Sequence, residues 1–147
     1  MKKLFSKEQI HFLLQFFLKF LIKKGNKTKN FIGINNIVSL LKKITKQDPF
    51  FIFLKIIQNI EPFCEVKNLK IRGVIRKVPV AIYPKRQKYL AIKFLIVNSK
   101  KRNEKPVAKK LTLEFLDALA LNGRSIKSCI DLHKTAEINK IFAQYRN

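Results

Sequence analysis

The stretch 65–93, EVKNLKIRGVIRKVPVAIYPKRQKYLAIK, decides how the rest of this chain can be interpreted. Its first part alternates apolar and polar side chains and is rich in β-branched residues, a composition typical of strands. Gly73 lies between two such runs and can supply a turn, because glycine readily adopts positive φ. Pro84 then suits the first position of a helix. The stretch therefore predicts a two-stranded antiparallel β-hairpin, about residues 65–82, that leads directly into a helix.

Positive charge is the most unusual property of the chain. The stretch 65–93 holds nine lysines and arginines against one acid, Glu65, and the whole 147-residue chain holds 32 against nine acids, a net charge of +23. Such a charge repels itself and usually indicates a polyanionic partner. Because the basic residues recur along the chain instead of lining one helix, nucleic acid is favoured over an anionic membrane surface. The 47% of hydrophobic residues still allow a core, which excludes a wholly disordered chain.

Apolar residues at helical spacing lie on both sides of the hairpin. Helix starts are indicated by Asp48 and Pro49, which suit an N-cap and the position after it, and by Ser6 and Ser128, which begin capping-box patterns. The predicted helices are 7–24, 30–46, 49–61, 84–101, 106–121 and 128–145. On the core side of the fourth helix we expect Leu90, Ala91, Phe94 and Val97. The predicted fold is mainly α: one domain, residues 1–147, in which a bundle of about six helices carries a protruding two-stranded β-hairpin between the third and fourth.

Catalytic and metal-binding patterns are weak in this sequence. His133 and Glu137 lie one helical turn apart but lack the companions of a zinc site, so we interpret them as a hydrogen-bonded surface pair. Glu114 and Asp117 are interpreted as salt-bridge partners of Lys110 and not as catalytic acids. The two cysteines form no CxxC motif, and we expect both to be reduced. The chain is predicted to be no enzyme and to need neither metal nor cofactor.

Basic residues cluster at two points of the stretch 65–93. Residues 70–77 place four of them around the turn, and residues 85–88 place three at the helix start, where backbone N–H groups already favour phosphate. Arginine adds a planar donor fork that matches phosphate oxygens. The predicted nucleic-acid-binding residues are Lys2, Lys3, Lys27, Lys29, Lys67, Lys70, Arg72, Arg76, Lys77, Lys85, Arg86, Lys88, Lys100, Lys101 and Arg102.

Several runs of the sequence resemble the family of small-subunit ribosomal protein seven, the S-seven family. The first group comprises PFCEVK at 62–67, RG at 72–73, VPV at 78–80, PKR at 84–86 and LAI at 90–92. The second comprises LE at 113–114, LDA at 116–118 and the C-terminal run HKTAEINKIFAQYR at 133–146. Order and spacing agree from about residue 62 to residue 146. Residues 1–61 match only in the layout of their helices.

The resemblance implies both a fold and a function. It implies a helical domain with a protruding β-ribbon, binding to the 3′ domain of small-subunit rRNA, and support for assembly of the subunit head. It also implies neighbouring head and platform proteins, no catalysis and no cofactor. The residues listed above then become rRNA-binding residues. The ribbon and last helix are expected near the exit-site tRNA, through Arg72, Val74, Tyr145 and Arg146.

Two departures from the family pattern bear on the origin of the chain. Bacterial members begin with an Arg-rich arm, whereas here only Lys2, Lys3 and Lys7 remain. The composition is rich in Lys, Ile, Asn and Phe, and no transit peptide is evident. Together these features predict an organelle-encoded member, mitochondrial in preference to plastid or bacterial cytoplasm. The alternative functions are an architectural DNA-binding protein that uses the basic ribbon and a membrane-surface protein inserted through the Phe-rich first helix.

Overall fold

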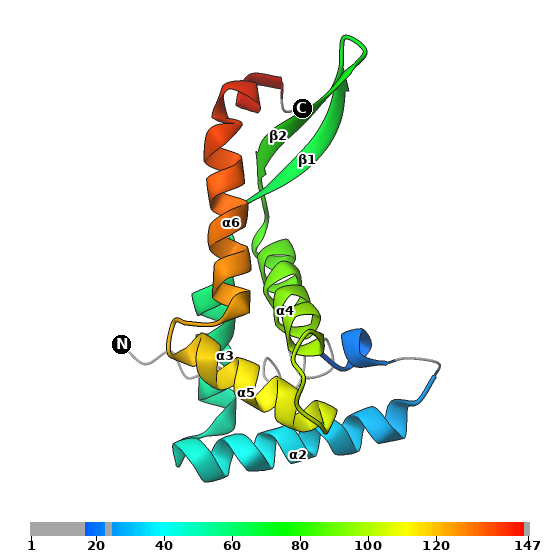
Figure 1. Ribbon diagram of the computed structural model, residues 1–147, viewed down its shortest axis with the longest axis vertical. Coiled ribbons are helices and arrows are strands. Elements are labelled where there is room, and N and C mark those ends of the chain that lie inside the picture. Colours follow the sequence, from blue (N-terminus) through cyan, green and yellow to red (C-terminus); the bar gives the residue numbers. More distant parts are fainter. Residues whose placement is uncertain (1–16, 23–24, 146–147) are drawn as a thin grey trace.

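The computed structural model describes residues 17–22 and 25–145. The fold is mainly helical, with an antiparallel hairpin between the third and fourth helices, as predicted (Figure 1). Residues 17–21 are helical, and the remainder of the predicted first helix lies outside the described residues. The elements that follow are α2 (Lys27–Thr45), α3 (Pro49–Ile60), β1 (Cys64–Ile71), β2 (Val74–Ala81), α4 (Pro84–Lys100), α5 (Val107–Leu119), α6 (Arg124–Ile138) and the 3₁₀ helix η1 (Lys140–Tyr145).

The main core lies where α2, α3, α4 and α5 meet. The rings of Phe17, Phe53 and Phe115 pack together there, with centroids 5.5–5.7 Å apart. Helix α3 is apolar on most of its surface and begins as predicted, because the Asp48 side chain accepts a hydrogen bond from the N–H of Phe50 (3.1 Å) and Pro49 occupies the first turn. None of the described helices is long and apolar enough to cross a membrane.

The buried face of α4 differs from the predicted one. Leu90 and Ala91 are buried and Phe94 packs against the core, as expected, but Val97 is exposed. Leu95 and Ile96 are buried on this helix instead. The difference arises because α4 packs against α3, α5 and α6. A helix with neighbours on several sides buries a wider stripe than one periodic series of residues describes.

The hairpin closes with a two-residue turn. Its register pairs Cys64 with Ala81 at the base and Ile71 with Val74 at the tip. Between them, Arg72 and Gly73 both have positive φ (48° and 83°), the combination of a type I′ turn, whose twist suits the right-handed twist of the strands. The turn predicted at Gly73 is confirmed.

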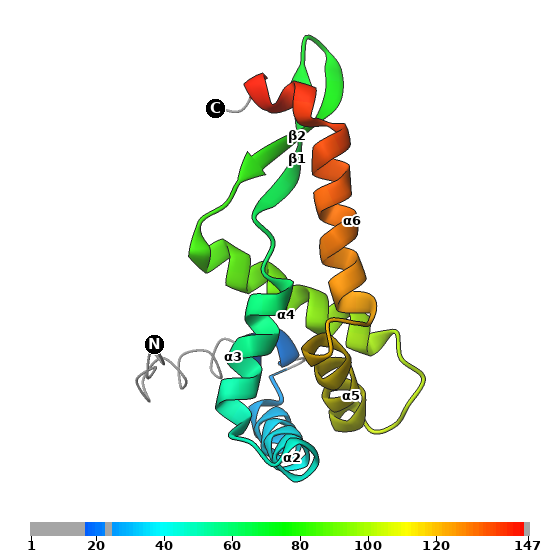
Figure 2. The same ribbon diagram turned by 90° about the vertical axis from the view of Figure 1, so that its left-hand side faces the viewer.

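The hairpin and α6 rise side by side from the helical core, and η1 lies against the hairpin near its tip (Figures 1 and 2). Strand β1 contacts α6, and β2 contacts η1. Val78 of β2 is fully buried, although it lies outside the main hydrophobic cluster. An isolated hairpin is only marginally stable in water. The predicted need for helical support is confirmed, and α6 with η1 supplies it.

The last helix corrects the sequence prediction. It starts at Arg124 and ends at Ile138, so Ser128 lies inside the helix instead of capping it. The Ser128 hydroxyl donates to the carbonyl of Arg124 (2.9 Å) and accepts from the amide of Asn98 (3.0 Å). Two other boundaries also shift. Helix α2 begins at residue 27 instead of 30, and α5 ends at residue 119 instead of 121.

Candidate nucleic-acid interface

Most of the predicted binding residues of the hairpin and the α4 start are brought into one part of the molecule. The side chains that share this location are exposed: Lys67, Lys70, Arg72, Arg76, Lys77, Lys85, Arg86 and Lys88. We call this group the basic arm. Lys100 and Lys101 lie at the opposite end of α4, and Lys27 and Lys29 lie at the start of α2. Lys2, Lys3 and Arg146 lie outside the described residues.

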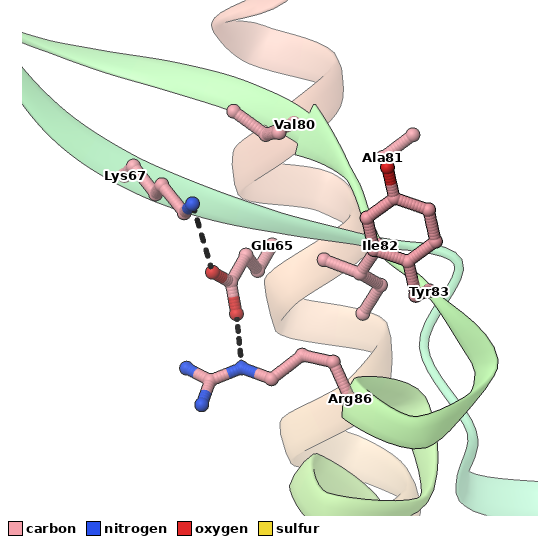
Figure 3. A pocket seen from close by; sticks show the side chains of 7 residues that line it. All are labelled: Glu65, Lys67, Val80, Ala81, Ile82, Tyr83 and Arg86. Carbon is pink, nitrogen blue, oxygen red and sulfur yellow. Dashed lines mark hydrogen bonds and ion pairs between the residues drawn. The ribbon is translucent and has the colours of Figure 1, made fainter.

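The two halves of the basic arm are joined by the one acid of the stretch. Glu65 of β1 accepts from Nε of Arg86 in the first turn of α4 (2.9 Å), and Lys67 Nζ lies 3.8 Å from its other oxygen (Figure 3). The Glu65 side chain is only 13% exposed, whereas that of Arg86 is 48% exposed. The Arg86 guanidinium also lies over the ring of Tyr89, 4.9 Å from its centroid. The hairpin base is thereby held in register with the start of α4.

A second contact orients the outer part of the hairpin. The guanidinium of Arg76 on β2 lies 5.3 Å from the ring centroid of Phe142 in η1. Such a cation–π contact stabilises by roughly 0.5–1 kcal/mol at an exposed site. Val74 and Tyr145, predicted to lie near tRNA, are both exposed, Val74 beside the turn and Tyr145 at the end of η1.

Arg102 has a different environment from the other predicted binding residues. Its side chain is 17% exposed and donates to three carboxylates: Nε to Glu114 (2.8 Å), one terminal nitrogen to Asp117 and the other to Glu104 (3.5 Å). Burial alone would lower the pKa of Arg102, but the hydrogen bonds to Glu114 and Asp117 outweigh it and raise that pKa. A guanidinium held in this way has few donors left for phosphate, so the basic arm does not include Arg102.

Glu114 is the residue that sequence reasoning missed. It is fully buried, and its Oε1 accepts from both the N–H (3.1 Å) and the hydroxyl (2.6 Å) of Ser125 in the first turn of α6. Gly123, the N-cap of α6, has no side chain to do this, so Glu114 of α5 caps α6 from a neighbouring helix. Its predicted partner, Lys110, instead donates to the backbone carbonyl of Arg102. Only the acid–base pairing could have suggested this role from sequence, and it indicated the wrong partner.

Comparison with known proteins adds the family to this geometry. The chain matches the family described as Ribosomal protein S7p/S5e over residues 2–140. This chain belongs to the ribosomal protein S7p/S5e family. The match extends well before residue 62, into a region where the sequence resembled the family only in helix layout. Members are structural and non-enzymatic, and membership supports a structural role in the small ribosomal subunit.

The relatives of this S7p/S5e chain include bacterial proteins named small ribosomal subunit protein uS7. One from Marinobacter nauticus is 34% identical over 130 residues, covering 88% of this chain and 83% of the relative. One from Finegoldia magna is 38% identical over 124 residues, covering 84% and 78%. One from Maridesulfovibrio salexigens is 42% identical over 102 residues, covering 69% and 65%. The named relatives are all bacterial, and an organelle origin of this chain stays a prediction.

His133, within the C-terminal run typical of the S7p/S5e family, has a partner other than the predicted Glu137. Its Nε2 accepts from the N–H of Phe63 (3.2 Å), and its ring stacks on the Phe63 ring with centroids 5.8 Å apart. This contact ties the entry of β1 to α6. Cys64 and Cys129 are free thiols whose pKa values are raised by burial, and the nearby Cys64 charge further raises that of Cys129.

Glu61, at the C-terminal end of α3, provides a test of pH dependence. Burial raises the pKa of its carboxyl group, and the attraction of Lys88 only partly opposes this. A raised folded-state pKa favours folding while the carboxyl is protonated, and this contribution is lost as pH rises through the folded-state pKa. We expect Glu61→Gln to raise the free energy of unfolding at pH 7 by up to about 0.5 kcal/mol, with a smaller gain near pH 4. Urea denaturation at both pH values measures this.

The matched control is Glu137→Gln, which removes the same charge from an exposed position on α6. It allows for the general effect of charge on so basic a protein, because both variants reach the same net charge. A Glu61→Gln variant that gains no more at pH 7 than at pH 4, relative to this control, would contradict the assigned burial cost.

Proposed function

We propose that this chain is a structural constituent of the small ribosomal subunit that binds the 3′ domain of small-subunit rRNA through the basic arm. The observation that carries the proposal is the joining of the exposed hairpin and the α4 start by Glu65 and Arg86, in a member of a ribosomal protein family. The hairpin and α4 then present their cations as one surface. Lys27, Lys29, Lys100 and Lys101 would add contacts at other points of the domain.

The mode of recognition follows from the kind of residues in the basic arm. Lysine and arginine neutralise phosphates, so counterion release supplies most of the affinity. A-form RNA is recognised largely by its shape, backbone and unpaired nucleotides. With about 6–10 phosphates contacted, affinity should fall roughly 10³–10⁵-fold between 50 and 200 mM salt. The S7p/S5e chain would in this way support assembly of the subunit head.

Competition binding tests the proposal. The labelled chain is bound to a structured 3′-domain fragment of small-subunit rRNA at moderate salt, then challenged with unlabelled fragment or with duplex DNA of equal length. The proposal requires the RNA fragment to compete at far lower concentration than the DNA. Equal competition would favour the architectural DNA-binding alternative. Co-sedimentation with small ribosomal subunits at the same salt provides the second measurement.

Placement near the exit-site tRNA is a finer part of the proposal. Arg72 and Val74 lie at the hairpin tip, and Tyr145 ends η1, which packs against β2, so these residues belong to the same end of the molecule (Figure 2). A photoreactive group introduced at residue 74 should crosslink to tRNA in the exit site of assembled subunits. We further propose a mitochondrial ribosome as the location, to be tested by detecting the chain in purified organelle ribosomes.

A further inference from the structure

A hollow of about 670 Å³ opens beside the base of the hairpin (Figure 3). Its volume falls in the range of pockets that hold small organic ligands, roughly 300–1,000 Å³. One part of its lining is aromatic and apolar, formed by Tyr83 and Ile82. Another part is charged, formed by Glu65, Lys67 and Arg86. A ligand that suits both parts combines a flat apolar face with an anionic group.

Tyr83 presents its ring to solvent from a fixed backbone. The residue is 84% exposed, an unusual exposure for so large an aromatic side chain. As the N-cap of α4, it has an extended backbone whose carbonyl accepts from the N–H groups of Arg86 (2.8 Å) and Gln87 (3.0 Å). The ring can therefore stack on a planar ligand with little further loss of conformational freedom.

The cations of the hollow keep donors available for an anion. Arg86 uses Nε for Glu65, and its terminal nitrogens make no hydrogen bond to the described residues. Lys67 Nζ lies 3.8 Å from the Glu65 carboxylate, beyond hydrogen-bonding distance, so its ammonium keeps its donors. Glu65 neutralises one of the two positive charges and fixes the position of Arg86.

From these features we infer that the hollow binds one unpaired nucleotide of the RNA strand, with its base stacked on Tyr83 and its phosphate held by Lys67 and Arg86. Unpaired bases of RNA are commonly held by stacking on aromatic side chains, and flanking cations track the backbone. The inference rests on the proposed rRNA binding and adds to it a contact to a base, which the basic residues alone do not provide.

The test measures binding of the full chain to the structured 3′-domain rRNA fragment over a series of salt concentrations. Tyr83→Ala should weaken binding by roughly 5- to 150-fold, the range for loss of one stacked base. It should leave the slope of log affinity against log salt unchanged, because no charge is removed. Lys67→Ala should instead reduce that slope by about 0.7–0.9, as expected for one phosphate contact. Ultraviolet crosslinking followed by mass spectrometry should place a nucleotide on the peptide that contains Tyr83.

Two control variants separate stacking from other effects. Tyr83→Phe keeps the ring and should bind within about twofold of the unmodified chain. Phe51→Ala removes another exposed aromatic residue, on α3, and should also bind within about twofold. Wild-type affinity of a folded Tyr83→Ala variant, checked by circular dichroism, would overturn the inference. Failure of the unmodified chain to bind the fragment would instead overturn the proposed function.

Discussion

Replacing Arg102 by methionine is expected to lower the free energy of unfolding by about 3–5 kcal/mol, because the buried Glu114 carboxylate then loses its charged partner. Methionine keeps most of the aliphatic stem, so the loss reports on the guanidinium. Asp117 and Glu104 lose the same partner but are less buried. Urea denaturation followed by circular dichroism measures the change.

Two further variants identify the cause of this loss. Lys101→Met removes the same charge from the neighbouring, exposed residue and should change stability by no more than about 0.5 kcal/mol. Adding Glu114→Gln to Arg102→Met removes the unpaired buried charge, so the double variant should recover about 1 kcal/mol or more of the loss. An Arg102→Met variant as stable as Lys101→Met would show that the network contributes little.

Replacing Arg72, Arg76, Lys85 and Arg86 together by alanine is expected to weaken binding to the 3′-domain rRNA fragment about a thousandfold at 0.15 M salt. Each phosphate contact contributes about 0.9 to the salt slope, so loss of four removes about 3.6 from it. The helical fold should persist, because these side chains are exposed and the Glu65–Arg86 ion pair, largely solvated on the arginine side, contributes at most about 1 kcal/mol.

A second quadruple variant has the same net charge. Lys42, Lys43, Lys46 and Lys55 are exposed on α2, after it and on α3, away from the hairpin. Their replacement by alanine should weaken binding less than tenfold. Equal weakening by the two quadruple variants would mean that binding depends on total charge and not on the basic arm, which would contradict the assignment of the interface.

Features of this fold that depend on short stretches of chain were predictable. The Asp48–Pro49 start of α3 and the Gly73 turn both act through residues adjacent in sequence, and both are confirmed. The exposed cations of the hairpin and the α4 start also follow from local sequence, since charged side chains on a narrow hairpin have little structure to be buried in.

Features that depend on contacts between distant residues were not predictable in the same way. The start of α6 was placed too late because its cap comes from Glu114, eleven residues away from Ser125 and in another helix. Arg102 resembles its neighbours Lys100 and Lys101 in sequence, and only the packing of α5 shows that it is held by acids. Burial and pairing decide the role of such residues, and neither can be seen in the pattern of charges alone.

The capping of α6 by Glu114 has a consequence for how accurately the hairpin is aimed. With 15 residues and a rise of about 1.5 Å each, α6 acts as a lever about 22 Å long, whose far part leans on the hairpin. A change in tilt of about 5° at its buried end would displace its far end by about 2 Å, comparable to the length of a hydrogen bond. Substitutions at Arg102 or Glu114 could thus alter RNA binding without any contact to RNA, because they reset the aim of the arm.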